Sequence, residues 1–118
     1  MTTTGLKTLV LELRKFAKDR DWEQFHSPKN LSMALSAEAG ELLEHFQWLS
    51  EPESSRLDES KKLEVSFEMA DILLYLVRLA DVLEIDLIDA SLKKISLNQK
   101  KYPIALSKGT NKKYTELK

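Results

Sequence analysis

The stretch that decides the fold is ADILLYLVRLADVL, residues 70–83. Apolar side chains fall on nearly every side of a helix drawn through it, which is typical of a central helix covered by its neighbours. The whole chain has only three glycines and three prolines to mark turns. Long periodic segments with few turn residues predict an all-α fold, and we expect a subunit that resembles a four-helix bundle.

The other helices are predicted from apolar spacing and from residues that favour helix ends. We expect a first helix over about residues 4–20 and a third, containing the central stretch, over about residues 58–84. Ser27 can cap a helix and Pro28 suits its first position, so the second helix is expected from there to about Leu49. A fourth helix is expected from a cap at Asp86 to just before Pro103.

The chain of 118 residues is long enough for one domain with a real core. We assign this domain to residues 1–103. Residues 104–118 are basic and have no sustained helical period, so they are predicted to form a flexible tail or an arm on a neighbouring subunit. Residues 19–28 and 50–60 break the helical pattern and are predicted loops.

Composition and charge argue against several classes of protein. The net charge is −1, so no overall field attracts a nucleic-acid polymer or a membrane surface. No stretch reaches the roughly 18 apolar residues of a membrane helix, and residues 1–20 do not resemble a signal peptide. Without cysteine the chain has neither disulfides nor thiolate metal sites. We expect a cytoplasmic protein that binds neither nucleic-acid polymers nor membranes.

The second predicted helix carries two glutamates along the edge of its apolar face. With about 100° per residue, Glu41, His45 and Trp48 fall on one side of Glu38 and form a stripe with it. The apolar side holds Leu31, Leu35, Leu42 and Phe46.

The third predicted helix repeats this arrangement. Asp71, Tyr75 and Arg78 lie to one side of Glu68, and the apolar side holds Val65, Ile72, Leu76 and Leu79. We expect Arg78 to pair with a carboxylate rather than with a substrate. If the two helices pack face to face, four carboxylates converge: Glu38, Glu41, Glu68 and Asp71.

Four ionised acids this close together would be costly without a cation. Two charges about 6 Å apart repel by about 3 kcal/mol at an effective dielectric near 20, so six pairs sum to on the order of 15 kcal/mol. That sum rivals the whole stability of a domain. Oxygen ligands favour magnesium or manganese, so we predict a Mg²⁺ site with Mn²⁺ as a substitute. The alternative for each pair of acids is a solvated helix face without a function.

Two segments, EAGELLEHFQW at residues 38–48 and EMADILLYLV at residues 68–77, resemble the MazG-type all-α nucleoside triphosphate pyrophosphohydrolases with their ExxE and ExxD motifs. Together with RDWEQFHSPKNL at residues 20–31 and NQKKYP at residues 98–103, they are most similar to the dCTP pyrophosphatase branch. Many members carry a further acid where this chain has Ala37 and Phe67, which leaves the number of metal ions open.

The resemblance implies hydrolysis between the α- and β-phosphates of a deoxynucleoside triphosphate, with dCTP as the expected substrate and nucleotide-pool control as the expected role. It makes Glu38, Glu41, Glu68 and Asp71 the ligands of Mg²⁺, with Glu38 or Glu41 contacting the attacking water. The expected substrate contacts are Trp22, His26, Trp48, Tyr75, Lys94, Asn98, Lys101 and Tyr102. Lys94, Asn98 and Lys101 share one helix face, as phosphate ligands would.

The sequence also bears on assembly and on two alternative functions. A helix that is apolar on all sides is poorly covered by only three neighbouring helices of the same chain. We therefore expect a homo-oligomer, and the resemblance suggests a tetramer built as a pair of dimers. A ferritin-like di-iron bundle would need Glu-x-x-His pairs, whereas Glu41 and Asp71 occupy the third position after Glu38 and Glu68. A non-catalytic helical interaction module is the other alternative.

Overall fold

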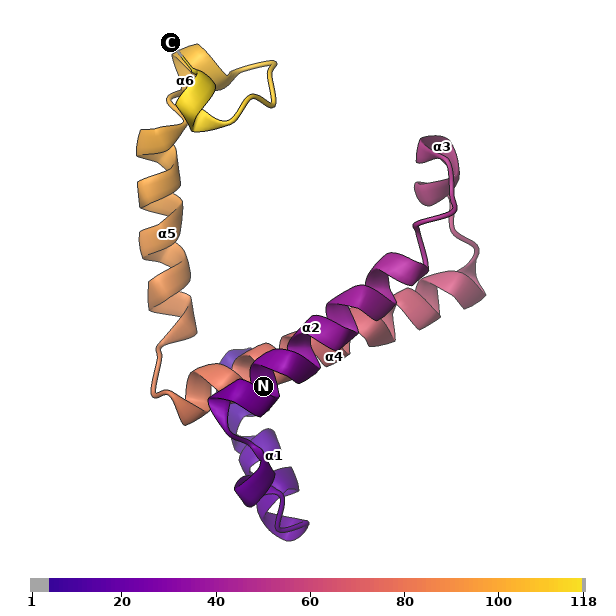
Figure 1. The fold of residues 1–118 in the computed structure, drawn as a ribbon, viewed down its shortest axis with the longest axis vertical. Helices are drawn as coiled ribbons and strands as arrows, with labels where there is room; N and C mark the ends of the chain where they lie inside the picture. Colours follow the sequence, from indigo (N-terminus) through magenta and orange to yellow (C-terminus); the bar gives the residue numbers. More distant parts are fainter. Residues whose placement is uncertain (1–4, 118) are drawn as a thin grey trace. The chain divides into compact units, whose positions relative to one another are not determined.

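The computed structural model describes residues 5–117 of the chain, and every element within them is helical (Figure 1). The long helices are α1 (Leu6–Asp19), α2 (Pro28–Glu44), α4 (Glu59–Val82) and α5 (Leu87–Lys101). The short ones are η1 (Glu23–Phe25), α3 (Glu51–Ser54), α6 (Ile104–Ser107) and η2 (Tyr114–Glu116). The predicted all-α class is confirmed.

The chain divides into two compact units, Met1–Glu84 and Ile85–Lys118. The first contains α1 to α4, and the second contains α5, α6 and η2. The domain boundary predicted after residue 103 falls inside the second unit. The segment after that residue also contains α6 and η2, although its sequence shows no sustained helical period.

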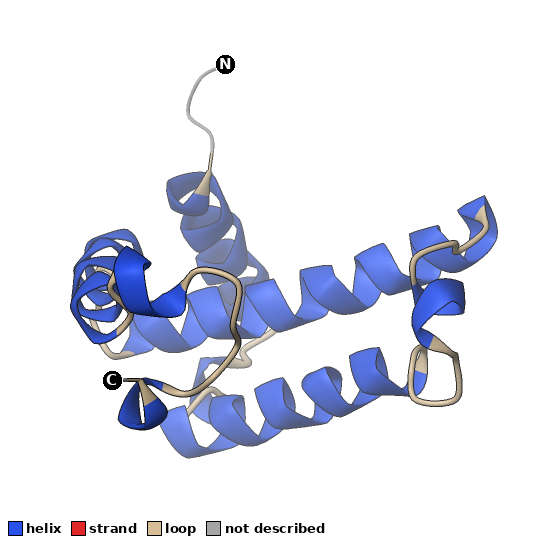
Figure 2. Ribbon diagram, turned by 90° about the horizontal axis from the view of Figure 1, so that it is seen from above, coloured by secondary structure: helices blue, strands red, loops and turns tan. Residues whose placement is uncertain are grey.

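The first unit is built around an antiparallel pair of helices, α2 and α4, which lie side by side (Figures 1 and 2). Helix α1 packs against α4 as well. The buried apolar side chains are Ala17, Leu31, Val65, Val77 and Ala80, three of which belong to α4. Helix α4 is therefore the central helix of this unit, as residues 70–83 predicted.

The helix starts follow the predicted caps. Ser27 Oγ accepts a hydrogen bond from the Asn30 amide at 3.1 Å, and α2 begins with Pro28. The Asp86 carboxylate caps α5 by accepting from the Asp89 amide at 2.9 Å. Each such cap contributes about 1 kcal/mol to the stability of its helix.

The end of α2 differs from the prediction. The helix stops at Glu44 rather than near Leu49, and residues 45–49 form turns. Helix α3 then lies inside the segment that was predicted as a loop. Its start is a capping box in which the Glu53 amide donates to Ser50 Oγ at 3.2 Å and the Ser50 amide donates to Glu53 Oε1 at 2.8 Å. The Ser-x-x-Glu spacing signals this helix start, and the prediction overlooked it.

Part of the apolar surface of α4 is left uncovered. Its large apolar residues Leu63, Phe67, Met69 and Leu73 are exposed, and Phe67 is 63% exposed. Several large exposed apolar side chains on one helix mark surface that another element or chain can cover. None of the described helices combines the length and the apolar character that a membrane crossing requires.

Candidate active site

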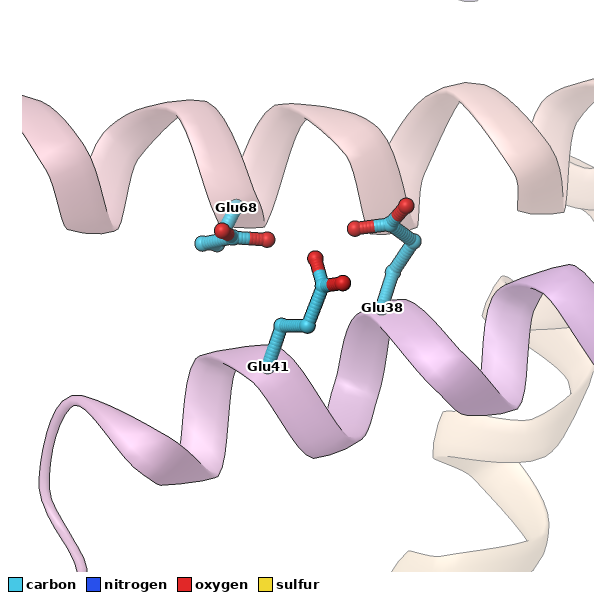
Figure 3. A group of neighbouring side chains, drawn as sticks. All are labelled: Glu38, Glu41 and Glu68. Carbon is cyan, nitrogen blue, oxygen red and sulfur yellow. The ribbon is translucent and has the colours of Figure 1, made fainter.

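Three carboxylates meet between α2 and α4. Glu38 and Glu41 lie one turn apart on α2, and Glu68 comes from α4 (Figure 3). Each offers one oxygen, and these oxygens all lie within 4.8 Å of one another. Figure 3 shows the three side chains turned toward one another across the space between the two helices. We call these three residues the acid cluster.

The acid cluster is electrostatically unfavourable when all its members are ionised. Glu38 Oε2 and Glu68 Oε2 are buried, and no described residue donates a hydrogen bond to either atom. Hydrogen bonding with the Glu41 carboxylate is the largest cause that raises the pKa of Glu38 to about 7, followed by burial and by the charges of Glu41 and Asp71. A hydrogen bond between two carboxyl groups needs one proton, so it favours the protonated form.

The acid cluster fits a divalent cation. Its donors are all carboxylate oxygens, which are the ligands preferred by magnesium and manganese. A cation at this place would satisfy the two buried oxygens of Glu38 and Glu68 and replace the proton that Glu38 otherwise retains. His45 lies at the edge, with Nε2 3.9 Å from Glu68 Oε1. The sequence placed His45 on this stripe, but the predicted set of ligands left it out.

Asp71, the fourth predicted ligand, lies apart from this group of three. Its side chain lines a neighbouring cavity, and its charge is one of the causes of the raised pKa of Glu38. Asp71 therefore connects the acid cluster to the cavity.

The cavity has a volume of about 290 Å³. It is lined by Leu13, Phe16, Trp22, His26, Leu31, Asp71, Leu74, Tyr75 and Arg78. The structure thus brings together three of the predicted substrate contacts, Trp22, His26 and Tyr75. The Trp22 ring is held edge-on by Phe16, with centroids 5.7 Å apart, and meets the His26 ring at 6.5 Å. A flat group that enters the cavity would find aromatic rings on its wall.

Arg78 has a role in the cavity wall that the sequence only partly indicated. It was expected to pair with a carboxylate, and its Nη1 lies 3.4 Å from Asp81 Oδ2. Its Nε also donates to His26 Nδ1 at 3.1 Å. The spacing of three residues between Arg78 and Asp81 could have identified that pair, whereas no local pattern links Arg78 to His26.

Trp48 lies beyond the end of α2. The sequence placed it on the helical stripe of Glu38 and Glu41, but α2 ends before it, and the side chain is 87% exposed. It is not among the residues that line the cavity. Its contact with a substrate stays a prediction.

The remaining predicted contacts belong to the second unit. Lys94 and Asn98 lie on α5 and are exposed, Lys101 is its last residue, and Tyr102 follows directly. The rings of Tyr102 and Tyr114 meet edge-on at 6.0 Å, and Lys101 Nζ lies 4.8 Å from the Tyr114 ring centroid. Tyr114, which the sequence analysis did not single out, therefore packs against Tyr102 and Lys101, two of the four residues predicted to contact phosphate or sugar.

This chain is similar in sequence to two mammalian enzymes that share one name. The chain is 45% identical to dCTP pyrophosphatase 1 of Mus musculus over 105 residues, and 44% identical to that of Homo sapiens over the same length. Each match covers 87% of this chain, while the chain spans 62% of the relative's length.

A solved structure and a sequence family extend these findings. The crystal structure of a pyrophosphatase from Archaeoglobus fulgidus DSM 4304 has a TM-score of 0.80 and 42% sequence identity, covering 87% of this chain and 96% of the other. The profile of the MazG-like family matches residues 33–117, which include Glu38, Glu41, Glu68 and Asp71. The chain therefore belongs to the MazG-like family.

Proposed function

We propose that this protein is a nucleoside triphosphate pyrophosphohydrolase that requires a divalent cation and converts dCTP into dCMP and pyrophosphate. The acid cluster, with two buried oxygens that lack a donor, lies next to an aromatic cavity, and this observation carries the proposal. The likeness to proteins named dCTP pyrophosphatase 1 supports the choice of substrate.

In this proposal Glu38, Glu41 and Glu68 hold Mg²⁺, and Asp71 completes the set of ligands from the side of the cavity. Mn²⁺ is the expected substitute. A bound cation of this kind neutralises phosphate charge and makes a water molecule a better nucleophile.

Either Glu38 or Glu41 also accepts the proton of the attacking water. Water attacks the α-phosphorus, the bond to the β-phosphate oxygen breaks, and pyrophosphate leaves. The water proton passes to Glu38 or Glu41, since a carboxylate within hydrogen-bond reach of the water can act as its general base.

The cavity is proposed to take the nucleobase. Its volume of about 290 Å³ lies at the small end of ligand pockets, which suits a single ring rather than a whole nucleotide. Trp22, His26 and Tyr75 contact the base there, and Trp48 stacks on the substrate from outside the cavity. The phosphates and the sugar are assigned to Lys94, Asn98, Lys101 and Tyr102 of the second unit.

We further propose that the protein acts as a cytoplasmic homo-oligomer, a tetramer built as a pair of dimers. Four exposed apolar residues of α4, Leu63, Phe67, Met69 and Leu73, support this, because other copies of the chain would remove them from water. The proposed partners are the nucleotide and other copies of the chain, with no nucleic-acid polymer and no membrane.

A nucleotide panel tests the proposal. Pyrophosphate release is measured for dCTP, dTTP, dUTP, dGTP, dATP and CTP in Mg²⁺, in Mn²⁺ and in chelator. We expect the highest kcat/KM for dCTP with Mg²⁺, and no turnover in chelator. Glu41→Gln prepared in parallel shows that activity does not come from a contaminant.

Two results would contradict the proposal in different ways. A clear preference for dUTP or dGTP would refute the substrate. If no nucleotide is hydrolysed, the two alternative functions remain. Iron binding to the acid cluster would then indicate a ferritin-like bundle, and absence of metal binding would indicate an interaction module.

A further inference from the structure

A continuous set of hydrogen bonds runs from α1 to the wall of the cavity. Arg14 of α1 donates to Asp81 of α4 through both Nε, at 2.8 Å to Oδ2, and Nη2, at 2.6 Å to Oδ1. Arg78 donates to the same Asp81 through Nη1 at 3.4 Å. Arg78 also donates through Nε to Nδ1 of His26 at 3.1 Å, and His26 lies two residues before Pro28, the first residue of α2.

Arg78 is buried, with 8% of its surface exposed, so its charge needs compensation. The Asp81 carboxylate supplies it, and the hydrogen bond from Arg14 is the largest cause that lowers the pKa of Asp81. Tying α1 to α4 would need only the Arg14–Asp81 pair. The contact between Arg78 and His26 is therefore additional, and it points toward the cavity that both residues line.

The chemistry of this contact determines the state of His26. A guanidinium group is always charged and can only donate, so Nδ1 of His26 must be the unprotonated nitrogen. A neutral imidazole then carries its proton on Nε2. No described residue is a hydrogen-bond partner of Nε2. The ring therefore retains one N–H group for a molecule that enters the cavity.

The charges around His26 agree with the neutral form. Burial is the largest cause that lowers the pKa of His26, the positive charge of Arg78 is the second, and Glu23 acts in the opposite direction. Asp71 and Tyr75 are the other titratable residues that line the same cavity.

We propose that Arg78, anchored by Asp81, is a positioning residue that fixes His26 as the neutral Nε2–H tautomer, so that His26 donates a hydrogen bond to an acceptor atom of the group bound in the cavity. The identity of that group rests on the proposed function, in which it is a pyrimidine base. Such a base carries carbonyl and ring-nitrogen acceptors that match an N–H donor. An imidazolium could not accept from Arg78, and the other tautomer would present an acceptor in place of the donor.

Nitrogen NMR of the full chain tests the positioning role without any measurement of activity. The chain has two histidines, His26 and His45, so His45 serves as an internal reference in the same spectra. We expect wild-type His26 to show the Nε2–H signature at neutral pH. Arg78→Met keeps the length of the side chain but removes the donor, so the two tautomers should mix and the pKa of His26 should rise. Arg56→Met, which removes an exposed arginine, should change neither histidine.

The NMR result decides the first half of the proposal. If His26 keeps the same tautomer and the same titration in Arg78→Met, the positioning role is wrong. Should Arg78→Met not fold, Asp81→Asn weakens the anchor while Arg78 stays in place. An unchanged His26 signature in that variant would overturn the proposal equally.

Kinetics test the second half, the hydrogen bond to the bound group. In Arg78→Met the KM for dCTP should rise by about tenfold, as expected for the loss of one hydrogen bond, while kcat changes less. Arg78→Lys should rescue only in part, because one ammonium group cannot reproduce the two directed contacts of a guanidinium. A changed tautomer with an unchanged KM would refute the donor role. If the wild type hydrolyses no nucleotide, the proposed function fails, whereas the NMR experiment still decides the role of Arg78.

Discussion

Glu38 and Glu41 lie one turn apart on α2, and their carboxyl groups interact beside Glu68 of α4. This interaction is the main reason that the pKa of Glu38 rises to about 7. The folded protein without a cation therefore binds a proton at a pH where the unfolded chain has already released it. These same carboxyl groups are the ones that we propose bind a divalent cation.

The first prediction concerns stability and pH in chelator. Between the ordinary pKa of 4.5 and the folded value of about 7, the folded state binds more protons at Glu38 than the unfolded state. The contribution of Glu38 to the free energy of unfolding should therefore fall as the pH rises through this window. Urea unfolding at a series of pH values measures this slope. Glu38→Gln should reduce it, and Glu44→Gln, an exposed control on the same helix, should retain it. An unchanged slope in Glu38→Gln would contradict the shared proton.

The second prediction concerns Glu41→Gln, which keeps the shape of the side chain and removes its charge. Turnover should fall by several orders of magnitude, because charge stabilisation by a bound metal is worth several kcal/mol and about 1.4 kcal/mol corresponds to tenfold in rate. Thermal stability in chelator should hold or rise, since one of the repelling charges is gone. Mg²⁺ should raise the melting temperature less than in the wild type, because weaker binding gives a smaller stabilisation.

Melting curves with and without Mg²⁺, together with pyrophosphate release, check this prediction. The same pattern is expected for Glu68→Gln and Asp71→Asn. Glu44→Gln is the matched control and should be nearly silent in both measurements. A purely structural role for Glu41 predicts the reverse, with a much lower melting temperature in chelator and surviving turnover.

The third prediction separates the two tryptophans. Trp48 is 87% exposed, so Trp48→Ala should leave the melting temperature nearly unchanged. Its KM for dCTP should rise more than kcat falls, because stacking binds the ground state and the transition state alike. Trp22→Ala, in contrast, should lower the melting temperature, since Trp22 packs against Phe16. If Trp48→Ala has wild-type KM and kcat, Trp48 does not contact the substrate.

The fourth prediction concerns assembly. Light scattering at micromolar concentration should show an oligomer for the wild type, with a tetramer expected. Phe67→Glu places a charge at one of the exposed apolar residues of α4 and should shift the protein toward smaller species while circular dichroism stays helical. Lys29→Glu, a charge reversal at an exposed polar residue of α2, is the control and should assemble normally. A monomeric wild type would refute the proposed assembly.

Local sequence patterns determined most of the helices of this protein. Ser27 and Asp86 were identified as caps because short polar side chains bind free amides at helix starts, and both do so in the structure. Apolar spacing identified residues 70–83 as part of the central helix. The same periodicity placed Glu38 and Glu41 one turn apart, and the ExxE and ExxD motifs indicated the family.

The errors occurred where local signals compete. The apolar pattern of α2 continues to Leu49, but the helix ends at Glu44, and the capping box of Ser50 and Glu53 starts a new helix soon after. Because α2 ends at Glu44, the helical stripe that carries Glu38 and Glu41 does not determine where Trp48 lies. Capping and apolar spacing both act locally, so the sequence contained the signal that would have corrected this prediction.

Only the tertiary structure decided which side chains meet across helices. Periodicity assigns a residue to a face, but the neighbour it contacts on another helix depends on how the two helices are packed and shifted along each other. The packing of α2 on α4 brings Glu68 to Glu38 and Glu41, and it leaves Asp71 at the cavity. It also joins Arg78 to His26, 52 residues away along the chain. Contacts of this kind arise from the packing of whole helices, which no local spacing encodes.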